Sequence, residues 1–374
     1  MDHPINSKPI RVLVVDDSAL ARKIITTSLA EFSDIEVVGT AVDPYVARDR
    51  ILELNPDVIT LDIEMPRMDG ISFLKVLMKY RPMPVIVLSS LTVAASEKAM
   101  EALQAGAIDV MEKPSGSYSA HVDGARLAEK IRAAAHANVR LHQSTSAQPQ
   151  TAAKTPAPAH GNRAFPARKL ILMGASTGGT EALKTVLTSM NGDLPGICIV
   201  QHIPAYFSKA FADRLNQICR MEVREAKHGD IVRPGLALIA PGGYHLLVKW
   251  QGHQYEVALN EGAPIHHQRP AVDILFDSAV KAGAGPHVTA ALLTGMGADG
   301  AAGLLHLREA GAMTIAQNEE TSVVFGMPRE AIRLGAARHV LPLEQIGLRL
   351  EQLVSQPPQN PSRPARIENE YNPK

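Results

Sequence analysis

The sequence contains little cysteine and no excess of charge of either sign. Only two cysteines, Cys198 and Cys219, occur in 374 residues. Two isolated thiols make neither a disulfide framework nor a metal pair of the usual spacing, and they fit a reduced, cytoplasmic setting. Lys and Arg total 38, as do Asp and Glu, so the chain lacks an overall basic field that would collect nucleic acid. We therefore expect no nucleic-acid partner.

Long apolar runs are also missing. No stretch reaches the roughly 18 apolar residues that a transmembrane helix needs. The opening MDHPINSKPIRVLVVDD has a short apolar run that ends in two aspartates, so it is neither a signal peptide nor a membrane anchor. We expect a cytoplasmic protein that does not insert into a membrane. The length of the chain suggests two or three domains.

Short apolar runs alternate with helix-period stretches through the first part of the chain, residues 9–136. Stretches such as SALARKIITTSLAEF and GISFLKVLMKY repeat their apolar residues every three or four positions, which is typical of helices. Strands that alternate with helices predict a parallel sheet with helices on both faces, here a doubly wound (βα)5 domain. The expected strands are 11–15, 35–39, 57–61, 85–89 and 109–113.

A change of composition separates this domain from a second one. Residues 137–168 become rich in Ala, Pro, Gln, Ser and Thr and are predicted to be a flexible linker. A second doubly wound α/β domain is predicted over 169–355, with a mostly parallel sheet to which the hairpin HLLVKWQGHQYEVAL adds an antiparallel element. The polar segment 356–374 is predicted to be a disordered tail.

Acidic side chains gather at strand ends of the first domain. Asp16 and Asp17 follow the first strand and Asp62 ends the third, so all three lie at the carboxyl edge of the predicted sheet. Clustered carboxylates repel one another unless a cation lies among them, and Mg²⁺ suits oxygen ligands. Ser89 and Lys113 end the fourth and fifth strands and could contact a phosphoryl group held on a carboxylate. Any one of these acids alone could be a helix cap.

The stretch GASTGG, at residues 174–179, admits two interpretations. It fits the G-x-S-x-G pattern around a nucleophilic serine, Ser176, and it also resembles a phosphate-binding turn at a helix start. The phosphate interpretation lacks its partners, because the next strand ends in Gln201 and His202 without an acid and no Walker lysine follows. His202 lies at the same sheet edge as Ser176, and Asp299 is the only carboxylate in the turn TGMGADG.

Other interpretations of these residues stay open from spacing alone. Ser176 and Asp299 could each be a helix cap. The chain has 14 histidines, and His245, His266 and His267 compete with His202 for a role as the base. The chain order serine, histidine, aspartate differs from that of the α/β-hydrolases, so a triad here would lie on a different fold.

The motifs of the first domain resemble those of receiver domains in two-component response regulators. VVDDS, LDIEMPRMDG, LSS and the pair Lys113-Pro114 carry the resemblance. It implies that Asp62 is the phosphoacceptor, that Ser89 is the switch hydroxyl and that Lys113 contacts the phosphate. The Mg²⁺ ligands that the resemblance implies are Asp16, Asp17, Asp62 and the backbone carbonyl of Glu64.

The second domain resembles the catalytic domain of the chemotaxis protein-glutamate methylesterases. GASTGG, QHIP, HGD, APGGYH, RPAVDILF, LTGMGADGAAGL and VVFGMPREAI carry the resemblance. It implies a nucleophile at Ser176, a general base at His202 and an orienting acid at Asp299. The backbone N–H groups of Thr177 and Met296 would form the oxyanion hole.

The same resemblance implies a substrate and partners. The substrates would be glutamate methyl esters and glutamine amides on the cytoplasmic helices of chemoreceptors, and a chemotaxis histidine kinase would phosphorylate Asp62. The unphosphorylated receiver would block the approach of the chemoreceptor. The esterase would need no cofactor. The alternatives are a receiver joined to a nucleotide-dependent α/β enzyme and a non-catalytic adaptor that binds receptors. No role is predicted for His266 or His267.

Overall fold

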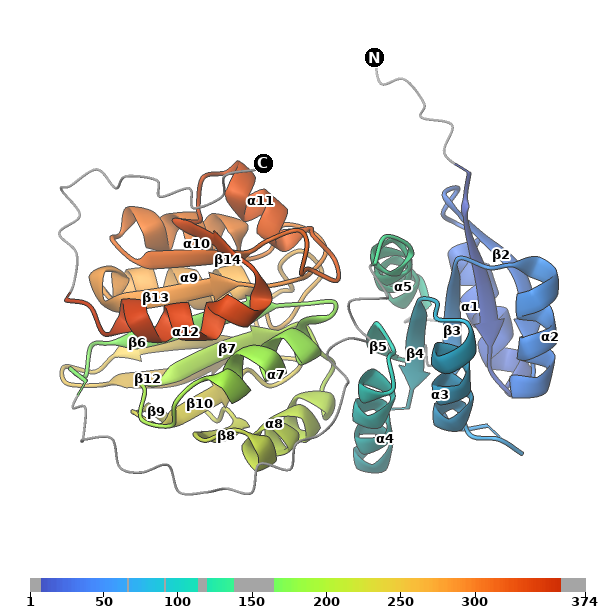
Figure 1. Ribbon diagram of the computed structural model, residues 1–374, viewed down its shortest axis with the longest axis horizontal. Helices are drawn as coiled ribbons and strands as arrows, with labels where there is room; N and C mark the ends of the chain where they lie inside the picture. The colour runs from blue at the N-terminus through green and yellow to red at the C-terminus, as the bar shows by residue number, and fades with distance from the viewer. Residues whose placement is uncertain (1–7, 66, 91, 114–119, 138–164, 358–374) are drawn as a thin grey trace, which may run out of the picture. The chain divides into compact units, whose positions relative to one another are not determined.

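Two α/β units make up the chain, residues 1–147 and 148–374, and we describe each by itself. The structure is a computed structural model that describes residues 8–65, 67–90, 92–113, 120–137 and 165–357 (Figure 1). Most of the predicted linker and nearly all of the predicted tail lie outside the described residues. Among the described helices, none has the length and apolar character needed to span a bilayer.

The first unit holds a five-stranded parallel sheet with the order β2-β1-β3-β4-β5, as the alternating pattern predicts (Figure 1). The central strands β3 and β4 are buried along their whole length because helices cover both faces. The strands are β1 (Ile10–Val15), β2 (Ile35–Ala41), β3 (Val58–Asp62), β4 (Val85–Ser89) and β5 (Asp109–Glu112). The helices are α1 (Ala19–Leu29), α2 (Pro44–Leu54), α3 (Gly70–Tyr80), α4 (Val93–Gln104) and α5 (Ala120–Ala135).

Short polar side chains start four of these helices. Ser18, Asp43, Asp69 and Thr92 each accept a hydrogen bond from a backbone N–H group in the first turn of α1, α2, α3 and α4, respectively. Such caps satisfy backbone donors that have no partner inside the helix. Because other residues cap these four helices, Asp16, Asp17 and Asp62 at the sheet edge do not act as their helix caps.

The second unit holds a seven-stranded parallel sheet with the order β15-β14-β13-β6-β7-β10-β8. Helices pack on both of its faces (Figure 1). The strands are β6 (Leu170–Ala175), β7 (Ile197–Gln201), β8 (Glu222–Glu225), β10 (Leu236–Ile239), β13 (Val288–Leu292), β14 (Met313–Gln317) and β15 (His339–Leu341). The helices are α7 (Gly179–Ser189), α8 (Phe207–Ile218), α9 (Val272–Lys281), α10 (Ala301–Glu309), α11 (Met327–Arg333), α12 (Leu343–Val354) and the short 3₁₀ helix η1 (Gly285–His287).

The predicted hairpin is present, but it does not extend the parallel sheet. Its strands β11 (His245–Trp250) and β12 (Tyr255–Asn260) pair with each other and with β9 (Ile231–Val232) in a separate three-stranded sheet. The placement expected from the sequence was therefore wrong. An alternating apolar pattern indicates a half-buried strand, but it carries no information about which sheet the strand joins.

The central strands of the large sheet bring three loops together. β6 lies between β13 and β7, so the segments that follow these three strands leave the same carboxyl edge side by side. These segments begin at residues 176, 202 and 293, and each contains a residue singled out in the sequence. Neighbouring strands thus bring positions that are far apart in sequence to one place.

Candidate active site

Ser176 is the first residue after β6 and is held by its own backbone. Its N–H group donates to the carbonyl oxygen of Thr294 at 3.0 Å, and its carbonyl oxygen accepts from the N–H group of Gly179 at 2.7 Å. The amide of Gln201 also donates to that carbonyl oxygen, at 2.8 Å. Gly178 begins α7 with a φ of 76°, which favours glycine. The turn is therefore fixed, and Ser176 as a whole residue is only 7% exposed.

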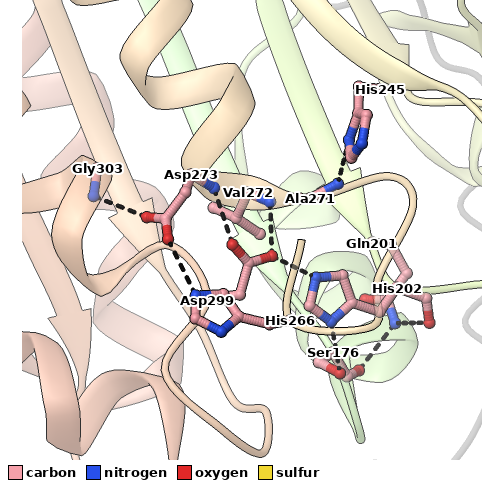
Figure 2. Close-up of polar contacts among 10 residues, drawn as sticks. All are labelled: Ser176, Gln201, His202, His245, His266, Ala271, Val272, Asp273, Asp299 and Gly303. Atoms are coloured by element: carbon pink, nitrogen blue, oxygen red, sulfur yellow. Dashed lines mark hydrogen bonds and ion pairs between the residues drawn. The ribbon is translucent and has the colours of Figure 1, made fainter. Parts of the chain in front are cut away.

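The structure brings the three predicted residues into contact (Figure 2). The Nδ1 atom of His202 lies 3.1 Å from the Oγ atom of Ser176, and its Nε2 atom lies 2.7 Å from Oδ2 of Asp299. All three side chains are buried. A hydroxyl, an imidazole and a carboxylate joined in this order form the arrangement that activates a serine as a nucleophile.

The start of α9 holds Asp299. Its Oδ2 atom accepts the N–H group of Val272 at 2.7 Å, and its Oδ1 atom accepts the N–H group of Asp273 at 3.0 Å. Burial alone would raise the pKa of Asp299, but the hydrogen bond and charge of His202 and the backbone donors of α9 outweigh burial and hold that pKa below its usual value. Asp299 is therefore ionised at neutral pH.

The ionised acid determines which ring nitrogen of His202 faces the serine as a base. A carboxylate only accepts hydrogen bonds, so Nε2–H donates to Asp299 and the neutral ring presents the lone pair of Nδ1 to the hydroxyl of Ser176. In the more familiar triad Nε2 faces the serine and Nδ1 faces the acid, whereas here Nδ1 faces Ser176 and Nε2 faces Asp299. The chemistry is the same, because either nitrogen can take the proton.

A glycine-rich turn lies directly against Ser176. A Cβ atom on Gly295 would lie 2.6 Å from Cβ of Ser176 and 2.3 Å from the sulfur of Met327, so no side chain fits there. Met296 follows Gly295, and Thr177 follows Ser176. The backbone donors predicted for an oxyanion hole therefore come from two segments that lie together, and their role stays a prediction.

The competing histidines His245 and His266 have partners other than Ser176. The Nδ1 atom of His245 accepts the N–H group of Ala271 at 3.2 Å, and its Nε2 atom lies 3.0 Å from the carbonyl oxygen of Ala263 (Figure 2). His266 lies 3.7 Å from Oδ2 of Asp273 and is largely exposed. His266 and His267 both have left-handed backbone conformations.

Sequence reasoning missed three polar side chains at the site. The side chain of Gln201 donates to the carbonyl oxygen of Ser176, and that of Thr294 donates to the carbonyl oxygen of Thr177. The carboxylate of Asp273 accepts from Gly303 in the helix that follows Asp299. Gln201 entered the sequence analysis only as a strand end without an acid. Its position next to His202 was a signal that its side chain lies at the site. The motif RPAVDILF contained Asp273, but nothing in its spacing predicted the partner of that carboxylate.

The first unit gathers the predicted acids around a lysine. Carboxylate oxygens of Asp16, Asp17 and Asp62 lie within 4.8 Å of one another. The ammonium of Lys113 lies 3.0 Å from Oδ2 of Asp16 and 2.7 Å from Oδ2 of Asp62. Apart from this ammonium, those two buried oxygens have no hydrogen-bond partner among the described residues, so they keep lone pairs for a cation. A set of carboxylate oxygens fits a hard ion such as Mg²⁺.

Burial and charge shift the titration of this acidic pocket. Burial raises the pKa of Asp62, and the contact with Lys113 offsets this only in part. Burial would lower the pKa of Lys113, but the hydrogen bonds and charges of Asp62 and Asp16 outweigh it and raise that pKa. The hydroxyl of Ser89 is buried and donates to the carbonyl oxygen of Ala95 at 3.4 Å.

Glu64 lies in the loop after β3. Its backbone N–H donates to Oδ1 of Asp62 at 3.0 Å, and its side chain pairs with Lys98 at 3.4 Å. The side chain therefore points to a surface lysine, which is compatible with a role for the backbone carbonyl alone.

The fold and the two sites define a class of protein in which an acidic α/β receiver unit is joined to an α/β unit with a serine, histidine and aspartate in contact. Residues 12–119 match the response regulator receiver domain, and residues 171–350 match the CheB methylesterase family. The chain belongs to the family of CheB-type protein-glutamate methylesterases that carry a receiver domain, as the resemblance of its motifs predicted.

Relatives match over most of the chain. Protein-glutamate methylesterase/protein-glutamine glutaminase 2 of Syntrophus aciditrophicus (strain SB) is 51% identical over 92% of this chain and 99% of its own length. Protein-glutamate methylesterase/protein-glutamine glutaminase 1 of Cupriavidus metallidurans is 51% identical over 91% of this chain and 95% of its own. The crystal structure of the Thermotoga maritima CheB methylesterase catalytic domain covers 50% of this chain and 98% of its own, at 38% identity and a TM-score of 0.49.

Proposed function

We propose that this chain hydrolyses glutamate methyl esters and glutamine amides on chemoreceptors, with Ser176 as nucleophile, His202 as general base and Asp299 as orienting acid. One observation carries the assignment of residues: the continuous contact from the Ser176 hydroxyl through the ring of His202 to Asp299, at 3.1 and 2.7 Å. The family to which the chain belongs supports the reaction, and the names of its relatives support the substrate class.

Acylation follows from the proton positions. The Nδ1 atom of His202 takes the hydroxyl proton of Ser176 while Oγ attacks the ester carbonyl carbon. The new imidazolium is stabilised by Asp299, and the backbone N–H groups of Thr177 and Met296 would hold the oxyanion. When the tetrahedral intermediate collapses, the imidazolium gives its proton to the departing methoxide, and methanol leaves an acyl-serine.

Deacylation repeats these steps with water. His202 takes a proton from water as the water oxygen attacks the acyl carbon, and the Oγ atom of Ser176 regains a proton as the glutamate side chain leaves. With a glutamine side chain the first leaving group is ammonia in place of methanol. The same site therefore serves both reactions, and the esterase needs no cofactor.

The receiver would control this reaction by phosphorylation of Asp62. A chemotaxis histidine kinase would be the phosphodonor. Asp16, Asp17, Asp62 and the carbonyl of Glu64 would hold Mg²⁺, which when bound neutralises charge on the phosphoryl oxygens. Lys113 would pair with the phosphoryl group, and Ser89 would leave the carbonyl of Ala95 to donate to it.

Methanol release from membranes that contain methylated chemoreceptors tests the proposal. The Ser176→Ala variant is expected to lose at least about 10³-fold in rate, because the nucleophile is gone. Ser189→Ala is the matched control, since Ser189 ends the same helix that Ser176 precedes and its hydroxyl donates to the carbonyl of Val186. A Ser176→Ala variant that releases methanol as fast as the control would refute the assignment and favour a non-catalytic adaptor.

A further inference from the structure

Two helix starts exchange carboxylates beside the proposed triad. Asp299 precedes Gly300, which begins α10, yet its carboxylate accepts backbone N–H groups of α9. Asp273 lies in the first turn of α9, yet its Oδ1 atom accepts the N–H group of Gly303 in α10 at 2.7 Å (Figure 2). Each helix therefore caps its free donors with an acid from the other helix.

Close packing fixes this exchange. A Cβ atom on Gly303 would lie 2.8 Å from Cβ of Phe276 and 3.0 Å from Oδ1 of Asp273, so only glycine allows α10 to approach α9 this closely. Asp273 thus holds the first turn of α10, and the turn directly before it carries Asp299. A shift of this turn would change the contact between Asp299 and His202.

We propose that Asp273 is a positioning residue for the reaction, which holds the turn of Asp299 through Gly303 and supplies a second negative charge behind the His202–Asp299 pair. The inference rests on the roles proposed above for Ser176, His202 and Asp299. Asp273 contacts neither Ser176 nor His202, and it acts on them through Asp299.

The charges around Asp273 support this role. Its carboxylate and that of Asp299 have oxygens within 4.8 Å of each other. Asp277 adds a further negative charge on the next turn of α9, and the Nε2 atom of His266 lies 3.7 Å from Oδ2 of Asp273. Burial, followed by the charge of Asp299, raises the pKa of Asp273 to about 6, so the group is mostly ionised at neutral pH.

An ionised Asp273 adds negative charge behind the ring of His202. A negative charge close to the ring favours the imidazolium that forms when Nδ1 takes the serine proton. The charge of Asp273 reaches His202 through one intervening carboxylate, which lies 2.7 Å from the ring. Activity is lost when the pH falls and His202 becomes protonated. When the charge of Asp273 is removed, this loss should occur at a lower pH.

The test uses the Asp273→Asn variant of the full chain. The amide oxygen of Asn can still accept from Gly303, so the variant removes the charge while keeping the cap. The probe is a fluorophosphonate: Oγ of Ser176 forms a bond to phosphorus, fluoride leaves, and His202 takes the proton. The rate constant for labelling, measured against pH with excess probe, reports the base and does not depend on how much protein is folded.

Asp277→Asn is the matched control. It makes the same change of charge on α9 one turn further along, and Asp277 also has a histidine partner, His306, at 2.7 Å. We expect the midpoint of the pH profile to fall by roughly half to one pH unit in Asp273→Asn and by clearly less in Asp277→Asn. A midpoint that is unchanged in Asp273→Asn, or moved equally by both variants, would overturn the proposal.

The labelling experiment separates this inference from the proposed function. A wild type that reacts with the probe but releases no methanol from receptors would contradict the methylesterase assignment and leave the comparison of pH profiles intact. A wild type that releases methanol, with Asp273→Asn profiles identical to its own, would contradict only the role of Asp273.

Discussion

Buried Thr294 connects the two segments that would supply the oxyanion hole. Its Oγ atom accepts the N–H group of Val324 at 2.9 Å and lies 3.0 Å from the carbonyl oxygen of Thr177, to which it can donate. Its own N–H group donates to Oε1 of Gln317 at 2.8 Å. One hydroxyl thus fixes the peptide after the proposed nucleophile relative to the glycine turn that precedes Met296.

Thr294→Val is expected to lower kcat roughly 10-fold with little change in KM, because the misplaced donors act on the transition state. Thr294→Ser keeps the hydroxyl and should restore most of the rate. Steady-state kinetics on a small ester checks both. Thr314→Val is the matched control, since Thr314 is fully buried on the neighbouring strand β14 and bonds to Ala336 and Arg338.

Both valine variants should lose on the order of 1–2 kcal/mol of unfolding free energy, because each leaves buried backbone groups without a partner. Only the Thr294 variant should lose rate per folded molecule. If Thr314→Val lowered kcat as much as Thr294→Val does, the effect would come from general destabilisation and not from the oxyanion segments.

The sequence predicted the three residues that meet at the site better than it predicted the residues whose hydrogen bonds hold them in place. Ser176, His202 and Asp299 follow strands that the sequence predicted, and parallel strands bring their carboxyl ends to one edge. Asp273 and Thr294 act through hydrogen bonds to segments 30 or more residues away, which depend on how α9, α10 and the loop after β14 pack. No local pattern encodes such partners.

At the scale of elements, the start of α9 and the start of α10 share one pH-dependent feature. The pKa of Asp273 is raised from 3.8 to about 6, while that of Asp299 is lowered. A raised pKa means that the folded state binds the proton more tightly than the unfolded state does. As pH falls from about 6 to about 4, protonation of Asp273 therefore stabilises the fold. Asp299 opposes this only at lower pH.

The wild type should gain on the order of 2 kcal/mol of unfolding free energy over this window relative to Asp273→Asn, which carries no titrating group there. Urea unfolding of both proteins at pH values between about 4 and 7 measures the difference. If the unfolding free energies of the two proteins changed in parallel with pH, Asp273 would have an ordinary pKa that its neighbours do not raise.

The elements that the sequence did not predict are short. β8, β9 and β15 contain two to four residues each, too few for an alternating pattern to stand out, and β8 and β15 lie at the edges of the large sheet. The buried strands β6, β7 and β13 were recognised because apolar residues dominate five or six successive positions in each. The hairpin was recognised, but its separate sheet depends on β9, which no pattern indicated.

At the scale of the whole molecule, the receiver should control the rate of the esterase. Addition of a small phosphodonor with Mg²⁺ is expected to raise methanol release by the wild type several-fold and to leave Asp62→Asn unchanged, because that variant cannot accept the phosphoryl group. Asp49→Asn is the control, since Asp49 is an exposed acid of the same unit that pairs with Arg48. Activation that persists in Asp62→Asn would place the phosphoacceptor elsewhere.

The most direct test of the account is to trap the acyl-enzyme. The protein is mixed with an activated ester and quenched in acid within the first turnover, and mass spectrometry of its peptides locates the acyl group. We expect an acyl group on Ser176 in the wild type, and little or none in His202→Gln, which lacks the base. An acyl group on another residue, or equal acylation of Ser176 without the ring of His202, would contradict it.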